Sequence, residues 1–285
     1  MGLAPAPPAR SDRWGTDAVL RYRMSSVPAS SGVLYFVERG AGPPLVLLHG
    51  ALLEGRMFEP VLEPLARHHR VIVPDLRGHG KSSGLAPSYA AGQLAADVSR
   101  LLGHLGVKST AVLGYSQGGA VAQQLALDDP GRCKQLVLVC SYAFNGATFR
   151  ERCEGHLTPW LIRLLGMKRL AALVVSRGLK RVGEARARGL AGLIAAQDEQ
   201  AMVGVWKAAL QFDSRSRLAE IRCPVLIVDG ERDEAVPSRH AEELAAGIAG
   251  SRRVTVPGAD HALIWTHADA LAHAANEFLR SAPTG

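Results

Sequence analysis

Short, continuous apolar runs alternate along this chain with longer segments of helical periodicity. The apolar runs are rich in β-branched residues, as strands buried on both faces of a sheet are, and they occupy residues 33–37, 45–48, 71–73, 110–113, 135–139, 225–228 and 253–256. The helical segments are 55–68, 88–105, 117–128, 238–249 and 267–280. This alternation predicts an α/β fold, with a mostly parallel central sheet flanked by helices.

Two segments depart from the alternation. Residues 19–24 and 33–38, separated by a stretch of Ser, Pro and Gly, predict an antiparallel hairpin at the edge of the sheet. Residues 145–217 show helical patterns but no convincing strand, and they are too many for a plain loop between two core strands. We therefore expect a disordered tail at 1–15, a core domain of 16–144 and 218–285, and an inserted helical cap at 145–217.

The positive charge of the chain is concentrated in one part of it. The net charge of the 285 residues is +7, and residues 145–222 contain 14 Lys and Arg against 7 Asp and Glu. A basic segment can bind nucleic acid or an anionic membrane surface, but no nucleic-acid-binding signature accompanies this one. We interpret it as a solvated helical face, or as a surface that attracts an anionic substrate or product.

Composition argues against several other classes of protein. No apolar stretch has the length of a membrane span, and the proline-rich N-terminus does not resemble a signal peptide. The four cysteines show no spacing typical of a metal site. We expect a cytoplasmic protein with no metal and no cofactor, and with neither nucleic acid nor membrane as a partner.

Residues 114–118 read Gly-Tyr-Ser-Gln-Gly and follow an apolar run directly. This is the pattern of a nucleophile elbow, a tight strand-to-helix turn that exposes the serine hydroxyl. Glycines are needed at its two ends because side chains there would collide with neighbouring backbone. The pentapeptide alone is a weak signal, so its meaning depends on what else lies near Ser116.

Polar residues follow several other predicted strands. Ligands of open α/β sheets bind beyond the carboxyl ends of the strands, where such residues meet. His49, Gly50 and Ala51 follow the run 45–48. The last two runs are followed by the acidic and imidazole side chains Asp229, Asp233, Asp260 and His261.

In combination, these motifs resemble the α/β-hydrolase superfamily, specifically its capped, serine-nucleophile branch. The resemblance implies that Ser116 is the nucleophile, His261 the base and Asp233, rather than Asp229 or Asp260, the acid. It also implies that the backbone N–H groups of Ala51 and Gln117 form an oxyanion hole.

The chemistry agrees with these roles, because a serine hydroxyl needs an imidazole to accept its proton and the imidazole needs a carboxylate on its other nitrogen. We expect a small-molecule substrate, a carboxylic ester or else a lactone or thioester, and the basic cap would suit an anionic one. Leu52, Phe58, Tyr115 and Trp265 are candidate substrate contacts. Trp160, Trp206 and Phe212 are weaker candidates, because aromatic side chains in helices are more often packing than ligand contacts. Two alternatives stay open: hydrolysis of a carbon–carbon bond in a β-diketone-type acid, and a ligand receptor on the same fold.

Overall fold

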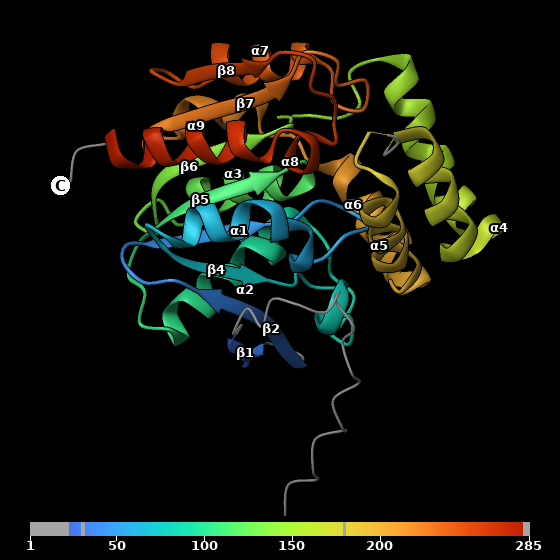
Figure 1. Ribbon diagram of the computed structural model, residues 1–285, viewed down its shortest axis with the longest axis horizontal. Coiled ribbons are helices and arrows are strands. Elements are labelled where there is room, and N and C mark those ends of the chain that lie inside the picture. Colours follow the sequence, from blue (N-terminus) through green and yellow to red (C-terminus); the bar gives the residue numbers. More distant parts are fainter. Residues whose placement is uncertain (1–22, 30–31, 179–180, 282–285) are drawn as a thin grey trace, which may run out of the picture.

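The residues that the computed structural model describes, 23–29, 32–178 and 181–281, form one eight-stranded sheet in the order β1-β2-β4-β3-β5-β6-β7-β8 (Figure 1). In this order, neighbouring strands from β4 through β3 to β8 pair in parallel, whereas β2 pairs antiparallel with both β1 and β4. The predicted α/β fold with a mostly parallel sheet is confirmed. The strands are β1 (Arg23–Ala29), β2 (Gly32–Arg39), β3 (Pro44–Leu48), β4 (Arg70–Pro74), β5 (Thr110–Tyr115), β6 (Cys133–Val139), β7 (Val225–Gly230) and β8 (Arg252–Val256).

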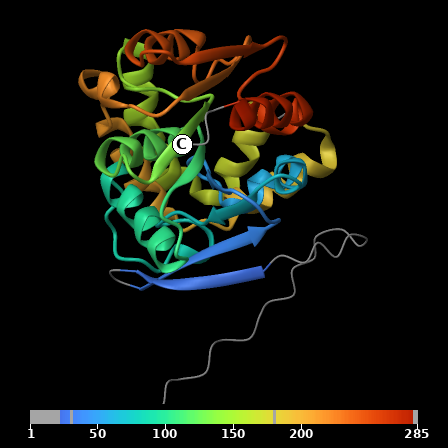
Figure 2. The ribbon, with the colours of Figure 1, turned by 90° about the vertical axis from the view of Figure 1, so that its left-hand side faces the viewer.

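The hairpin of β1 and β2 forms one edge of the sheet (Figure 2). Its first strand runs to Ala29 and so includes Pro28, in a stretch that the sequence had suggested was the connection. Proline is tolerated there because an edge strand has N–H groups that need no partner. Residues 19–22 of the expected first strand, and the expected tail at 1–15, lie outside the described residues.

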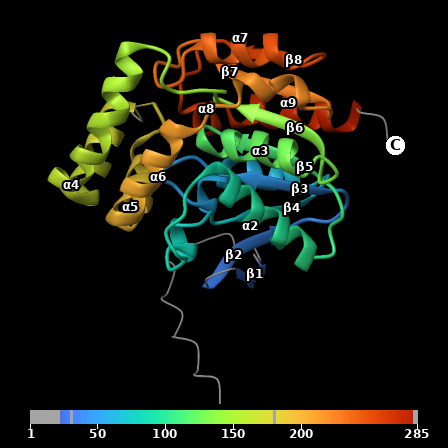
Figure 3. The same ribbon diagram turned by 180° about the vertical axis from the view of Figure 1, so that it is seen from behind.

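Alternate side chains of the buried strands feed two hydrophobic cores, one on each face of the sheet. In β3, Leu45 and Leu47 face one core while Val46 and Leu48 face the other. The first core is covered by α1 (Glu59–Ala66), α8 (Leu263–Thr266) and α9 (Ala268–Ser281). The second is covered by α2 (Ala91–His104), α3 (Gln117–Asp128) and α7 (Ser238–Gly247) (Figures 1 and 3).

Three α-helices of the described residues lie between β6 and β7 and stand beside the main body of the molecule (Figure 3). They are α4 (Phe149–Gly178), α5 (Glu184–Ala195) and α6 (Glu199–Gln211), and we call them the cap. Gly166, with φ 66° and ψ 164°, breaks α4 into two helical halves, a conformation that favours glycine. In the described ranges, no helix is long and apolar enough to cross a membrane.

Candidate active site

Ser116 occupies a tight turn between β5 and α3. Its φ of 53° and ψ of −120° are unusual for a residue with a side chain. The glycines around it have the steric role that the motif predicts: a Cβ at Gly118 would lie 2.0 Å from the Leu48 carbonyl oxygen, and one at Gly114 would lie 2.4 Å from the Gly118 oxygen. The α3 helix therefore packs against β3 and β5 too closely for any larger residue.

Hydrogen bonds on both sides hold the strained turn. The Ser116 N–H donates to the Val139 carbonyl at 2.9 Å, and the Ser116 carbonyl accepts from Ser141 Oγ and from the Gly119 N–H, both at 2.9 Å. Strain of this kind persists only where its surroundings fix the conformation. The backbone bonds fix the Ser116 side chain toward the cavity described below.

Asp233 and His261 meet beyond the ends of β7 and β8. His261 Nδ1 lies 2.8 Å from Asp233 Oδ2. The other oxygen of this buried carboxylate accepts the N–H groups of Ala235 and Val236, at 2.9 and 2.8 Å. These bonds hold the Asp233 carboxylate in place, and its position fixes the orientation of the imidazole.

The two competing aspartates have other partners. Asp229 accepts both Arg253 Nε and Nη2, at 3.0 and 2.8 Å, and also the hydroxyls of Ser238 and Thr255. Asp260 accepts the Ala262 N–H at 2.9 Å. Only Asp233, among the three candidates, is bonded to the His261 ring in the structure.

The loop after β3 brings Ala51 toward the elbow. A Cβ at Gly50 would lie 3.2 Å from Ser116 Cβ, so this loop and the serine are in contact. His49 supports the loop from below: its Nδ1 lies 2.9 Å from the Gly50 carbonyl, and its Nε2 lies 2.9 Å from the Leu76 nitrogen. Burial lowers the pKa of His49 to about 4, so the ring is neutral and can accept the Leu76 N–H.

The backbone N–H groups of Ala51 and Gln117 have no protein acceptor in the part of the chain that the structure describes. Gln117 begins α3, where the first N–H groups of a helix have no partner within it. These two donors lie on the two segments that border Ser116.

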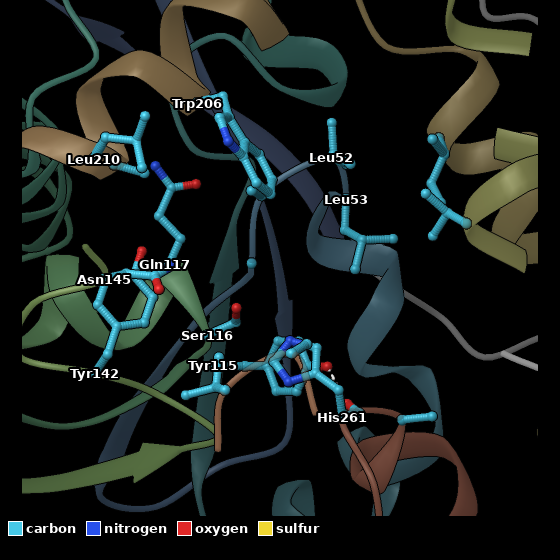
Figure 4. Close-up of a pocket in the computed structure, with 18 of the residues that line it drawn as sticks. Leu52, Leu53, Tyr115, Ser116, Gln117, Tyr142, Asn145, Trp206, Leu210 and His261 are labelled. Atoms are coloured by element: carbon cyan, nitrogen blue, oxygen red, sulfur yellow. Dashed lines mark hydrogen bonds between the residues drawn. The ribbon is translucent and has the colours of Figure 1, made fainter. Parts of the chain in front are cut away.

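A cavity of about 290 Å³ lies between these loops and the cap (Figure 4). Ser116 and His261 line it, as do Ala51, Gln117 and three of the predicted substrate contacts, Leu52, Tyr115 and Trp265. The fourth, Phe58, directly precedes α1, is fully buried in the first core and does not line the cavity. None of the described residues that line it is Asp, Glu, Lys or Arg.

The cavity also includes residues that the sequence did not single out as contacts. Val174, Ile194 and Leu210 reach it from the cap, and Tyr142 and Asn145 reach it from the segment after β6. Trp206, a weaker candidate from the sequence, also lines the cavity from the cap. Tyr142 and Asn145 follow a predicted strand just as His49 and Asp233 do, so inspecting the end of the run 135–139 would have found them. The cap residues carry no such signal, because a Trp or Leu in a helix is usually packing.

Cys140 lies beside the His–Asp pair, and ligand atoms of Cys140, Asp233 and His261 are all within 4.8 Å of one another. Metal binding would require the thiolate and free carboxylate oxygens. Burial and the neighbouring Asp233 raise the pKa of the Cys140 thiol, and both Asp233 oxygens already accept hydrogen bonds. We therefore do not assign a metal site to this group.

A serine elbow on a mostly parallel α/β sheet, with a His–Asp pair at the neighbouring strand ends, defines the class of α/β hydrolases. Residues 43–268 match the family model described as alpha/beta hydrolase fold. The chain therefore belongs to this family.

Relatives and solved structures agree with this assignment. The chain is 28% identical over 260 residues to a pimeloyl-[acyl-carrier protein] methyl ester esterase of Aliivibrio salmonicida, a match that covers 87% of this chain and 96% of the esterase. It is 31% identical to part of the polyketide synthase ThaQ of Burkholderia thailandensis, covering 86% of this chain but 12% of the synthase. A hydrolase from Pseudomonas aeruginosa has the same fold, with 31% identity, a TM-score of 0.83 and coverage of 90% of this chain and 98% of the other.

Proposed function

We propose that this protein hydrolyses carboxylic esters through an acyl-enzyme formed on Ser116. The observation that carries the proposal is the 2.8 Å contact between His261 Nδ1 and Asp233 Oδ2, beside a serine held in a strained elbow on the same cavity. Lactones and thioesters would react by the same chemistry, because each presents an acyl carbon and a leaving group to the nucleophile.

The proposed reaction has two halves. Ser116 Oγ attacks the acyl carbon while His261 Nε2 accepts the hydroxyl proton, and Asp233 stabilises the imidazolium that forms. The N–H groups of Ala51 and Gln117 donate to the developing oxyanion. The C–O bond to the alcohol then breaks, with His261 returning the proton to the leaving oxygen. Water, deprotonated by the same imidazole, releases the acid and regenerates Ser116.

The cavity favours an uncharged substrate. Its described lining is mostly apolar and has no Lys or Arg, so a carboxylate bound inside would lack a cationic partner. This differs from the expectation of an anionic substrate, because the basic residues of the cap do not reach the cavity wall. For the same reason we rank ester hydrolysis above carbon–carbon bond hydrolysis of an acid.

Replacing the nucleophile tests the mechanism. We expect Ser116→Ala to lower kcat for p-nitrophenyl butyrate by a factor of about 10³ or more. A fluorophosphonate probe should label Ser116 of the wild type, as located by peptide mass spectrometry. The matched control is Ser99→Ala. It removes a hydroxyl of α2 that donates to Asp129, and it should keep wild-type turnover. Full turnover by Ser116→Ala would refute the mechanism, and a wild type that binds esters without cleaving them would favour the receptor alternative.

A pair of substrates tests the preference for uncharged esters. We expect kcat/KM for p-nitrophenyl butyrate to exceed that for the p-nitrophenyl monoester of succinate by a factor of about ten or more, because the cavity would have to desolvate an unpaired carboxylate. Equal values, or a preference for the succinate ester that disappears at high salt, would show that the basic cap attracts the substrate.

A further inference from the structure

The first half of α4, before the break at Gly166, exposes a stripe of large apolar side chains. The exposed fractions are 77% for Phe149, 54% for Leu157, 58% for Trp160 and 58% for Leu164. At about 100° per residue these four positions fall within a sector of roughly 80° on the helix. We call them the α4 stripe.

The α4 stripe points away from the protein. The residues of this helix that pack inward are Glu151, Gly155, Pro159 and Ile162, on the opposite side of the helical wheel. Gly155 is in close contact with Leu210 of α6. Figures 1 and 3 show α4 at the outer side of the cap, and the exposed fractions of the four side chains show that no described element covers the stripe. Apolar patches of this kind mark interaction sites.

Cationic side chains border the stripe. On the helical wheel, the exposed Arg152 and Arg163 lie along one edge, and the exposed Arg150, which pairs with Glu154, lies along the other. They belong to the segment 145–222, in which Lys and Arg outnumber Asp and Glu by 14 to 7. The sequence therefore places aromatic and aliphatic side chains between basic ones on a single outward face.

We propose that the α4 stripe binds the surface of an anionic lipid bilayer. An exposed helix with Trp, Phe and Leu on one face and Arg along its edges inserts the apolar groups at the headgroup boundary, while the cations meet the lipid phosphates. A second copy of this chain fits less well, because two basic caps would repel each other. A surface contact of this kind needs no membrane-spanning helix, and the proposal differs from our expectation that the protein has no membrane partner. It does not depend on the proposed catalytic activity.

Vesicle co-sedimentation of the full chain tests the proposal. We expect binding to vesicles that contain phosphatidylglycerol, about tenfold or more weaker binding to phosphatidylcholine alone, and partial release at high salt. The triple variant Leu157→Ser, Trp160→Ser, Leu164→Ser should bind about tenfold or more weakly. Its control is the double variant Met24→Ser, Val33→Ser, which removes exposed apolar side chains of the β1–β2 hairpin and should bind as the wild type does.

Other occupants of the stripe give different results. Failure of the wild-type protein to bind anionic vesicles would overturn the proposal. Binding of the triple variant as tight as that of the wild type would overturn it too. A wild-type dimer that the triple variant converts to a monomer, with no vesicle binding, would show that a second copy covers the stripe. The substituted side chains are more than half exposed, so the thermal midpoint of the triple variant should match that of the wild type and a loss of binding would not reflect unfolding.

Discussion

At the scale of the residue, Asp229 near the end of β7 and Asp233 just after it differ because their neighbours differ. Asp229 is surrounded by Arg253 and two hydroxyls and links β7 to β8. Asp233, four positions later, uses one oxygen to close its own turn and keeps the other for His261. The first therefore stabilises the sheet, and the second holds a ring that lines the cavity.

We predict that Asp233→Asn lowers kcat by a factor of about 10³ to 10⁴, because an amide N–H₂ facing Nδ1 favours the wrong imidazole tautomer. Asp260→Asn is the matched control: it alters a carboxylate next to His261 that bonds only to backbone within its own turn and lies 4.0 Å from Arg181. Steady-state kinetics on p-nitrophenyl butyrate distinguishes the two. Similar losses in both variants would contradict the assignment of Asp233 as the acid.

At the scale of the element, Glu151 connects the cap to the core. Thr148 and Glu151 form a capping box at the start of α4: the Thr148 N–H donates to Glu151 Oε2 at 3.0 Å, and the Glu151 N–H donates to Thr148 Oγ1 at 3.2 Å. Glu151 Oε1 also pairs with Arg239 and lies 2.9 Å from His240 Nε2, both on α7. One buried carboxylate thus caps the start of α4 and attaches this helix to the hydrolase core.

We predict that Glu151→Ala lowers the free energy of unfolding by about 1–3 kcal/mol, since it removes a cap and leaves Arg239 without its partner. The loss should be local first, with faster hydrogen exchange in peptides covering 149–165 and unchanged exchange in β5. Glu154→Ala, which removes only an exposed pair with Arg150, should change stability by less than about 0.5 kcal/mol. Unchanged exchange in α4 of Glu151→Ala would argue against the attachment.

At the scale of the whole molecule, two buried histidines link stability to pH. The rings of His49 and His79 lie 4.8 Å apart. Burial lowers the pKa of His49 to about 4 and that of His79, which also faces the His49 ring, to about 3. Both values are below the ordinary pKa of about 6.5, so the unfolded chain binds protons that the folded protein does not. Stability from these groups is full above about pH 6.5 and decreases as the pH falls toward 4.

We predict that the free energy of unfolding decreases between about pH 6.5 and pH 4 by up to about 1.4 kcal/mol per pH unit for each of these two histidines. Urea denaturation at a series of pH values measures this slope. His79→Leu should reduce this slope by up to about 1.4 kcal/mol per pH unit, the contribution of one proton, whatever its effect on stability at neutral pH. The exposed His273, replaced by Leu, should leave the slope unchanged. A wild-type free energy that stays constant over this range would refute the prediction.

The sequence by itself determined the succession of strands and helices along the chain and the location of the elbow. Strands buried on both faces need continuous apolar runs, and surface helices need a repeat of 3.6 residues. Both patterns can therefore be recognised in short stretches of the sequence. The Gly-x-Ser-x-Gly pattern is local too, which is why Ser116 was recognised first. The contact that requires glycine at position 118 is with the distant Leu48 carbonyl, and only the structure shows it. The family resemblance selected Asp233 from three aspartates, and only the structure places it against His261.

The tertiary structure decided everything that depends on which faces of the elements meet. Phe58 is buried in the first core, whereas Tyr142 and the cap residue Trp206 line the cavity. The basic charge of the cap stays outside the cavity, and the α4 stripe faces outward because the opposite side of the helix carries the packing contacts. Which side chain packs against which depends on pairs of elements that lie far apart in the chain, so no local pattern of residues predicts it.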